Sequence, residues 1–484
     1  MQGLWYEINY GALNIKWFKF AKGGAYRKWY GNIDYVVNWL SNGLEIKNYV
    51  KKKYPYLKGN YGLVVKNENT YFSKGILTSR VTSGNLGFRI KSEEELYSDA
   101  CTAIFPNECY YLLGLVSTKI LEIVKQLNPT LNFQASDLER LPVRFDHQQK
   151  PHIENLVEEN IGISKIDYDS YETSWGFIKH PLIHWKVDSG KIKDAYENWQ
   201  HFTDEHFSLL KTNEEELNHI FIDIYGLQDE LKPEVEDKDI TIRKADQSRD
   251  IKSFISYAVG CMMGRYSLDE EGLVLAGGKF NSERYKTFKA DADGILPVLS
   301  DAYFEDDIVT QFSVFMKVTF GENTLVANLD YIAETLGRKA NESSRECIRR
   351  YFLKDFYKDH VQMYKKRPIY WLFTSGKEQG FNALVYMHRY DSSMVSRVRT
   401  DYLHPLQNKL EAEFLRLNQV MVSEDSPTEK TKATKRLKVL SKQMEELKKY
   451  DEVIHNLADQ QIEIDLDDGV VVNYAKFEKV LAKI

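Results

Sequence analysis

The spacing of the apolar residues changes once along the chain, and this change constrains the fold more than any other feature. Up to about residue 91, short apolar runs are broken by turns rich in glycine and asparagine, which is typical of strands joined by loops. Strands are predicted at 14–20, 35–39, 63–65 and 76–79. From residue 110 onward, apolar residues recur every three or four positions, which predicts helices. The expected fold class is therefore α+β, with a β-rich N-terminal module followed by a mostly helical body.

The helical pattern recurs through the body of the chain. Helices are predicted at 110–127, closed by Asn128-Pro129, and at 188–225, 251–263, 304–320, 325–336 and 343–357, with a short further segment at 133–143. The acidic triplet Glu214-Glu215-Glu216 is expected to form a solvated face of its helix. Gly260 and Gly264 form a G-x-x-x-G spacing, which in a chain without membrane spans indicates close helix packing.

The C-terminal region shows the clearest local signal. Apolar residues step by three and four over 403–421 and again over 437–447, which predicts an antiparallel helical hairpin. Between them, Ser426, Pro427 and Glu429 stand where an N-cap, a first-turn proline and the acid of a capping box would stand. The last segment, 462–472 around Asp467-Asp468-Gly469, predicts a β-hairpin.

These patterns predict four segments along the 484 residues. They are a basic, aromatic-rich, β-containing module at 1–145, a linker and docking segment at 146–193, an α-rich body at 194–400, and the helical hairpin with the terminal β-hairpin at 401–484.

Charge is distributed unevenly over these segments. The whole chain carries a net charge of −6, yet residues 1–91 carry +11 and hold 18 of the 63 aromatic residues. Cations interleaved with flat rings suit a surface that neutralises phosphates and packs against sugars and bases. The alternative is a tyrosine-rich β-core with a solvated basic face.

Several classes of protein are excluded by missing patterns. The sequence has no apolar run of about 18 residues and no signal peptide, so we expect no membrane span. Its four cysteines form no C-x-x-C pair, so we expect no metal site and a location in the reducing cytoplasm. No P-loop, dinucleotide-binding loop or nucleophile elbow occurs, and Pro181 separates His180 from His184. We therefore assign no catalytic residue. A nuclease built from dispersed carboxylates stays open as an alternative, because such a site leaves no local spacing.

Several segments resemble a known family. The first is Lys22-Gly23-Gly24-Ala25-Tyr26-Arg27-Lys28-Trp29-Tyr30-Gly31-Asn32, which is followed by similar segments at 35–39, 171–175, 214–231, 255–266, 366–371 and 386–390. Together they resemble the C-terminal part of the PglX/BrxX family, the adenine-specific DNA methyltransferases of bacterial BREX phage-defence systems. The resemblance covers nearly the whole chain.

The resemblance implies a division of labour between this chain and a catalytic half. In that family, an S-adenosylmethionine loop and an Asn/Asp-Pro-Pro-Tyr/Phe tetrad precede the Lys-Gly-Gly segment, and this sequence contains no Pro-Pro dipeptide. We therefore expect no cofactor and no methyl transfer by this chain alone, with S-adenosylmethionine bound by the missing half. The implied partners are double-stranded DNA, that catalytic half and other BREX proteins.

The candidate DNA-binding residues lie in the basic module. Phosphate contacts are predicted for Lys22, Arg27, Lys28, Lys51, Lys52 and Lys53, and base-edge contacts for Arg80, Thr82, Ser83, Asn85 and Arg89. Trp29 and Trp39 are expected in the core. The first hypothesis is thus a DNA target-recognition and scaffold module, and the second is a protein-interaction subunit that binds DNA only non-specifically.

Overall fold

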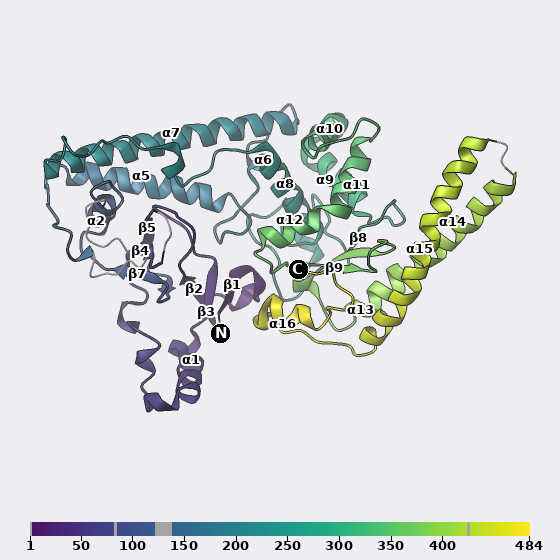
Figure 1. Ribbon diagram of the computed structural model, residues 1–484, viewed down its shortest axis with the longest axis horizontal. Helices are drawn as coiled ribbons and strands as arrows, with labels where there is room; N and C mark the ends of the chain where they lie inside the picture. The colour runs from purple at the N-terminus through teal and green to yellow at the C-terminus, as the bar shows by residue number, and fades with distance from the viewer. Residues whose placement is uncertain (1, 82–84, 122–137, 424–425) are drawn as a thin grey trace. The chain divides into compact units, whose positions relative to one another are not determined.

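The computed structural model describes residues 2–81, 85–121, 138–423 and 426–484. They form two compact units, and each unit is assembled from separate stretches of the chain. Unit 1 comprises Met1–Trp5, Ala12–Pro181 and Glu197–Asp246, and unit 2 comprises Tyr6–Gly11, Leu182–Tyr196 and Gln247–Ile484. The units divide the chain at other positions than the four segments predicted above. The α+β class is confirmed, because small sheets are combined with many helices (Figure 1).

Unit 1 contains two small sheets. One has the strand order β1-β3-β2-β6, from β1 (Gln2–Leu4), β2 (Trp17–Ala21), β3 (Tyr35–Asn38) and β6 (Glu95–Tyr97). The other has the order β5-β4-β7, from β4 (Gly75–Ser79), β5 (Phe88–Lys91) and β7 (Cys101–Ile104). Neighbouring strands are antiparallel except β2 and β6, which are parallel. The strands predicted at 14–20, 35–39 and 76–79 are confirmed as β2, β3 and β4, although β2 begins later than predicted, at Trp17.

The stretch between β3 and β4 differs from the prediction. The strand predicted at 63–65 is wrong, because Tyr61–Leu63 forms a 3-10 turn. Instead, α1 (Leu40–Lys53) appears where only a turn signal was visible. Ser41, Asn42 and Gly43 all have positive φ, and a side chain at Gly43 would meet the Trp39 ring at 2.6 Å. These three residues form a left-handed turn inside the bounds of α1, and the regular helix follows them, so the local signal marked this turn and did not reveal the helix.

Helices α2 (Cys109–Val116), α5 (Lys150–Asp169) and the main part of α7 (Ile192–Tyr225) complete unit 1. A Cβ at Gly114 of α2 would lie 3.0 Å from Val157 of α5 and 3.6 Å from Phe221 of α7, so glycine allows the three helices to pack closely. The helix predicted from residue 110 is confirmed as far as Val116. Its predicted end at Asn128-Pro129 lies outside the described residues, as do residues 133–137 of the segment 133–143.

A buried carboxylate on α7 holds the Lys22–Asn32 segment in place. Glu214 is 3% exposed, so the expectation that the whole triplet 214–216 is solvated is wrong for this residue. Its Oε1 accepts a hydrogen bond from the Trp29 indole at 2.7 Å, and its Oε2 pairs with the Lys28 ammonium. Trp29 is fully buried, as predicted, and its backbone bonds to Phe88 and Ile90 on either side of Arg89 in β5. One short segment therefore joins the β5 sheet to α7.

We predict that Glu214→Gln destabilises unit 1, because the buried Lys28 ammonium would lose its counter-charge. Breaking a buried ion pair costs about 3–5 kcal/mol. The thermal or denaturant midpoint of unfolding, followed by tryptophan fluorescence, should fall clearly. Glu216→Gln is the matched control, since Glu216 lies on the same helix with a half-exposed side chain. Equal midpoints for the two variants would contradict this role of Glu214.

Unit 2 is mostly helical. Its helices are α8 (Gln247–Met262), α9 (Ile308–Phe320), α10 (Leu325–Thr335), α11 (Ser344–Lys354), α12 (Phe356–Met363), α13 (Met394–Arg397), α14 (His404–Ser423), α15 (Pro427–Ala458) and α16 (Gly469–Ala475), and α6 (Pro181–His184) ends within it. The predicted helices of the body are thereby confirmed. The sequence patterns did not indicate its antiparallel sheet β8-β10-β9, formed by β8 (Ile295–Pro297), β9 (Tyr370–Thr374) and β10 (Asn382–Tyr386).

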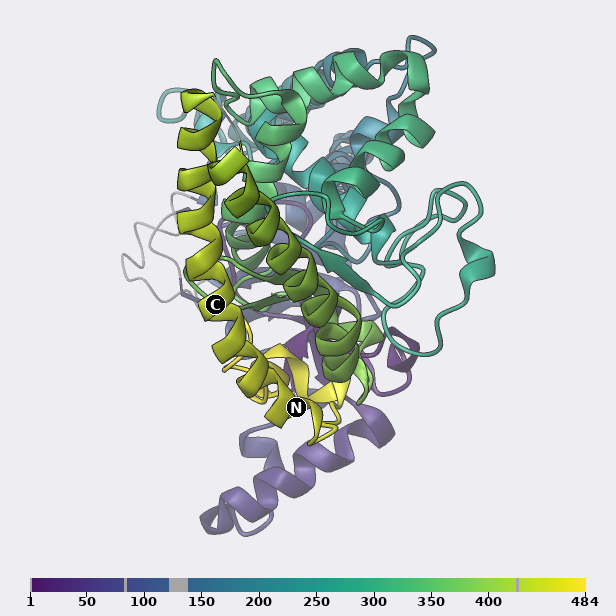
Figure 2. The same ribbon diagram turned by 90° about the vertical axis from the view of Figure 1, so that its right-hand side faces the viewer.

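The predicted helical hairpin is present. Helices α14 and α15 lie side by side and run antiparallel, as both ribbon views show (Figures 1 and 2). The Ser426 hydroxyl accepts a hydrogen bond from the Glu429 amide, and Pro427 is the first residue of α15. The N-cap predicted at Ser426 is therefore confirmed.

The predicted terminal β-hairpin is wrong. Leu466–Asp468 forms a 3-10 turn, and α16 follows it. The buried Glu7 carboxylate accepts a hydrogen bond from the Val470 amide at 2.7 Å and pairs with Arg367. A carboxylate at the start of a helix satisfies free amides there, so a residue near the other end of the chain favours helix over strand.

Three of the family-like segments meet in the core of unit 2. Arg265, which follows α8, is fully buried and donates hydrogen bonds to the hydroxyls of Tyr266 and Tyr386 at 3.1 and 3.0 Å. A Cβ at Gly260 would lie 2.5 Å from the Tyr266 ring and 3.2 Å from the Tyr370 hydroxyl. Gly260 is therefore tightly enclosed, but by Tyr266 and by Tyr370 of β9, so these contacts do not show the helix packing predicted from the G-x-x-x-G spacing.

Candidate nucleic-acid interface

Several predicted DNA-binding residues have structural partners instead of a free surface. Arg27 and Lys28 are 8% and 6% exposed, and they pair with Asp167 of α5 and Glu214 of α7. Arg89 is 2% exposed, and burial lowers the pKa of its guanidinium. In this conformation the three cations do not face solvent, so their predicted DNA contacts gain no support from their positions and stay predictions.

The other predicted residues differ in their exposure. Asn85 is exposed, and its amide donates to the Asp239 carboxylate at 2.8 Å. Lys22 is half-buried, with its ammonium 4.7 Å from the centre of the Tyr35 ring. Arg80 is exposed. Thr82 and Ser83 lie outside the described residues.

The three lysines that end α1 form the core of a solvent-facing surface. Lys51, Lys52 and Lys53 are all exposed in its last turn. The Lys53 ammonium lies 5.2 Å from the centre of the Tyr49 ring, and hydrogen bonding to the Tyr49 hydroxyl raises the pKa of Lys53, so this cation stays charged. Tyr49 is itself 47% exposed.

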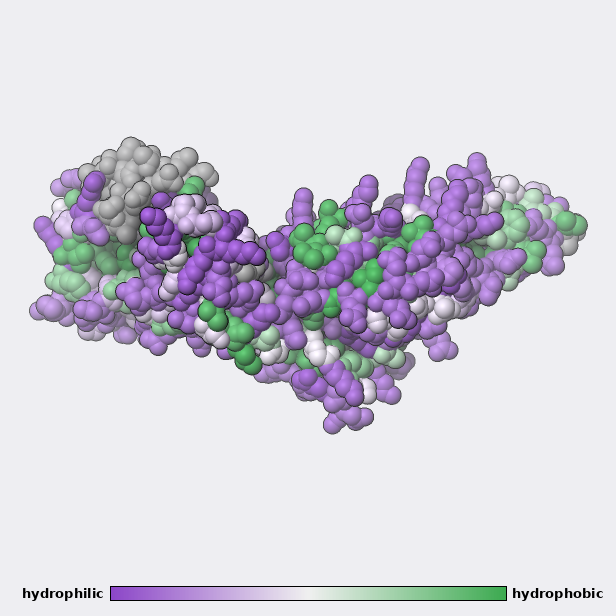
Figure 3. Space-filling view, turned by 90° about the horizontal axis from the view of Figure 1, so that it is seen from below, coloured by the Kyte–Doolittle hydropathy of each residue, from purple (hydrophilic) through white to green (hydrophobic). Residues whose placement is uncertain are grey.

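The chain after α1 extends this surface. Lys58 and Lys66 are exposed, and Tyr56 is 75% exposed. We call α1 together with residues 54–67 the α1 surface. Figure 3, the view from below, shows that hydrophilic side chains dominate the visible face of the molecule and that hydrophobic ones form small separate groups. Lysines alternating with exposed tyrosines provide both charge neutralisation and flat contact area.

A pocket of about 700 Å³ lies beside the α1 surface. Its walls come from the β1-β3-β2-β6 sheet, from α1, from residues 64–67 and from the region around β7. Its aromatic lining consists of Phe20, Trp39, Tyr49, Tyr54, Tyr71 and Tyr97. The volume falls in the range typical of small-molecule sites.

The rings of this pocket are held by one another. Tyr71 packs edge-to-face with Trp39 at 5.2 Å between ring centres and with Tyr97 at 5.6 Å. The Tyr97 hydroxyl shares a hydrogen bond of 2.6 Å with the Thr70 hydroxyl. Burial raises the pKa of Tyr71 to about 12, so its phenol is neutral at physiological pH. The rings of Trp39, Tyr71 and Tyr97 are therefore held in place by one another.

Polar side chains also line this pocket. Lys66, Asn67, Arg80 and Asp99 are all exposed. Within the part of the chain that the structure describes, their side chains make no ion pair or hydrogen bond with another residue. The pocket thus combines an apolar interior with unpaired donors and an acceptor. The sequence prediction included Arg80 and missed the other three, although Lys66 and Asn67 stand in the same run of lysines and tyrosines.

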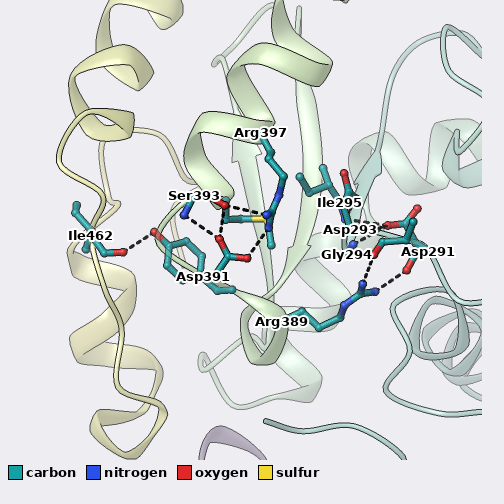
Figure 4. Close-up of polar contacts among 12 residues, drawn as sticks. Asp291, Asp293, Gly294, Ile295, Arg389, Asp391, Ser393, Arg397 and Ile462 are labelled. Atoms are coloured by element: carbon teal, nitrogen blue, oxygen red, sulfur yellow. Dashed lines mark hydrogen bonds and ion pairs between the residues drawn. The ribbon is translucent and has the colours of Figure 1, made fainter. Parts of the chain in front are cut away.

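Unit 2 contains a second polar cluster, which is drawn in Figure 4. Asp291 is half-buried before β8, and its Oδ1 accepts backbone hydrogen bonds from Asp293, Gly294 and Ile295. Arg389 donates to the backbone carbonyls of Asp291 and Ala292 at 2.7 and 2.6 Å. Burial, followed by a hydrogen bond and repulsion from Asp293, raises the pKa of Asp291 to about 7. The folded protein therefore holds a proton here that an unfolded chain would release near pH 4.

This raised pKa predicts a pH dependence of stability. The folded state binds more protons than the unfolded state between about pH 4 and pH 7, so stability should fall as pH rises through that range. Asp291→Asn is neutral at every pH and should lack this fall, so the variant should gain about 1–3 kcal/mol relative to the parent between pH 4 and pH 8. Denaturant unfolding at several pH values measures the difference.

Asp391→Asn is the control with the opposite sign. Burial raises the pKa of Asp391, but hydrogen bonds from Ser393 and Arg397 outweigh burial and bring this pKa below its ordinary value. The ionised form therefore stabilises the fold above the unfolded pKa, and that contribution is lost as pH falls. Identical pH profiles for the parent chain and Asp291→Asn would refute the raised pKa of Asp291.

Within the described ranges, no cluster of three or more histidine, cysteine, aspartate or glutamate side chains has a geometry suited to a metal ion. None of the helices found there combines the length and apolar character that crossing a membrane requires.

Comparison with known proteins identifies relatives of this chain. No protein-family model matches the sequence. The chain is 41% identical over 476 residues to the adenine-specific methyltransferase PglX of Lacticaseibacillus casei strain Zhang. This alignment covers 95% of this chain and 38% of that protein. The chain is 38% identical over 507 residues to the adenine-specific methyltransferase BrxX of Escherichia coli O9:H4 strain HS, and this second alignment covers 98% of this chain and 40% of that protein.

These matches establish homology to adenine-specific methyltransferases. In particular, the chain is homologous to the PglX/BrxX family, as the segments beginning with Lys22–Asn32 predicted. The chain spans about 40% of the length of the curated relatives it matches.

Proposed function

We propose that this chain is the DNA sequence-recognition and scaffold portion of an adenine-specific DNA methyltransferase of a BREX phage-defence system. The observation that carries the proposal is the α1 surface, where Lys51, Lys52 and Lys53 stand exposed among tyrosines in a homologue of adenine-specific methyltransferases. DNA backbones are bound by lysines that displace condensed counterions. The net charge of −6 does not oppose this, because the basic residues are concentrated in the N-terminal module.

Among the candidate base-edge residues, the solvent exposure of each side chain decides which one is preferred. Arg89 is buried in β5, whereas Arg80 is exposed just beyond β4. An arginine that reaches a base edge pairs best with guanine in the major groove. Arg80 is therefore the preferred base-edge candidate, and Thr82 and Ser83 follow it in the sequence.

Methyl transfer belongs to a separate catalytic half in this proposal. That half would bind S-adenosylmethionine, extrude the target adenine and complete the reaction, while this chain selects the site. Other BREX proteins are proposed partners of the assembled enzyme. The competing proposal is a protein-interaction subunit that binds DNA only non-specifically.

We predict that Lys52→Ala and Lys53→Ala weaken binding to every duplex equally. Each lost phosphate contact should lower the slope of log affinity against log salt concentration by roughly one. Fluorescence anisotropy with a labelled duplex at several salt concentrations measures this slope. Lys358→Ala, at an exposed lysine of unit 2, is the control and should leave the slope unchanged. A wild-type slope in the α1 variants would count against the α1 surface.

Arg80→Ala should act differently, because a base-edge contact discriminates between sequences. We expect this variant to lose about 1–3 kcal/mol on the preferred duplex and little on a scrambled one. The preferred duplex is first selected from a randomised pool with the wild-type chain. Failure of that selection, with only weak salt-labile binding to all duplexes, would favour the protein-interaction subunit.

A further inference from the structure

The pocket beside the α1 surface has features that point to a ligand. Its volume of about 700 Å³ exceeds what packing defects in a protein core leave open. Two apolar clusters border it, one containing Val37, Trp39 and Leu96, the other containing Leu77 and Tyr97. The cavity therefore lies where these clusters meet, with an apolar interior and a polar margin.

The lining favours a flat, aromatic ligand. Tyrosine and tryptophan rings make up much of the wall, and such rings stack on the faces of all four bases with little regard to sequence. An aliphatic chain would fill the apolar interior, but it would leave the donors and the acceptor of the margin unused.

The polar margin fits the edge and the phosphate of a nucleotide. A base edge carries both donors and acceptors, and the Asn67 amide and Asp99 carboxylate together provide both complements. Lys66 provides positive charge for a phosphate, and Arg80 at the same margin stays the base-edge candidate. A simple anion would not explain Asp99, and a simple cation would not explain Lys66 and Arg80.

We propose that this pocket receives one unstacked nucleobase of the bound nucleic acid. This inference rests on the proposed DNA-binding function and adds a second mode of contact to it. The α1 surface holds the backbone, and the pocket takes a single base that has left its stack. Bases that are already unpaired enter most easily, because no pairing energy has to be overcome.

The test uses the full chain and a single-stranded pentanucleotide with 2-aminopurine at its centre. A second pentanucleotide has an abasic site at the same position. We expect the first to bind about tenfold more tightly than the second, a ratio that corresponds to the stacking of one base. We also expect 2-aminopurine fluorescence to be quenched on binding, because the base would lie against the pocket's rings.

Two tyrosines provide a matched pair of variants. Tyr49 lines the pocket, whereas Tyr56 is exposed on the α1 surface and does not line it. Tyr49→Ala should reduce the preference for the intact pentanucleotide, and Tyr56→Ala should leave that preference unchanged. Asp99→Asn is a second pocket variant at an exposed position, and it should reduce the preference without loss of folding.

The outcomes separate this inference from the proposed function. Equal affinity for the intact and the abasic pentanucleotide would overturn the pocket inference, as would equal effects of Tyr49→Ala and Tyr56→Ala on the preference. If salt-dependent duplex binding persists in that case, the proposed DNA-binding function stands. Absence of duplex binding by the wild-type chain would overturn the proposed function itself.

Discussion

Unit 1 depends on one buried carboxylate. Glu214 of α7 accepts the indole hydrogen of Trp29 and pairs with the ammonium of Lys28, and both partners belong to the segment that also pairs with β5. Burying this charge is tolerable only because both of its oxygens are satisfied, and removing either partner would leave a desolvated group. The same contact joins a sheet formed early in the sequence to a helix that lies almost two hundred residues later.

This contact also separates the basic residues of the N-terminal module into two groups. Arg27 and Lys28 form ion pairs with Asp167 and Glu214, so they stabilise the fold. Lys51, Lys52 and Lys53 face solvent, and they remain available to a polyanion. A net charge of +11 over residues 1–91 therefore overstates the positive charge that this region exposes to solvent.

In unit 2, too, charged residues of the family-like segments stabilise the fold. The segments at 255–266, 366–371 and 386–390 resemble the PglX/BrxX family, and the sequence analysis assigned them no role. In the structure, Arg265 donates to the Tyr386 hydroxyl, and Arg367 pairs with the buried Glu7. Their polar side chains serve the core of unit 2, where each buried donor needs a partner.

Local signals in the sequence determined the α+β class, most helices and the capped start of α15, because helix period and N-cap chemistry act between residues only a few positions apart. The helix at Gly469–Ala475 escaped prediction, since its free amide is satisfied by Glu7. The pocket escaped prediction as well, because its walls come from stretches that are far apart in the chain. Lys28 and Lys52 are the same amino acid in the same basic module. Only the tertiary structure decided that one is buried against Glu214 and the other is exposed, because the burial of a charge depends on which distant group folding brings beside it.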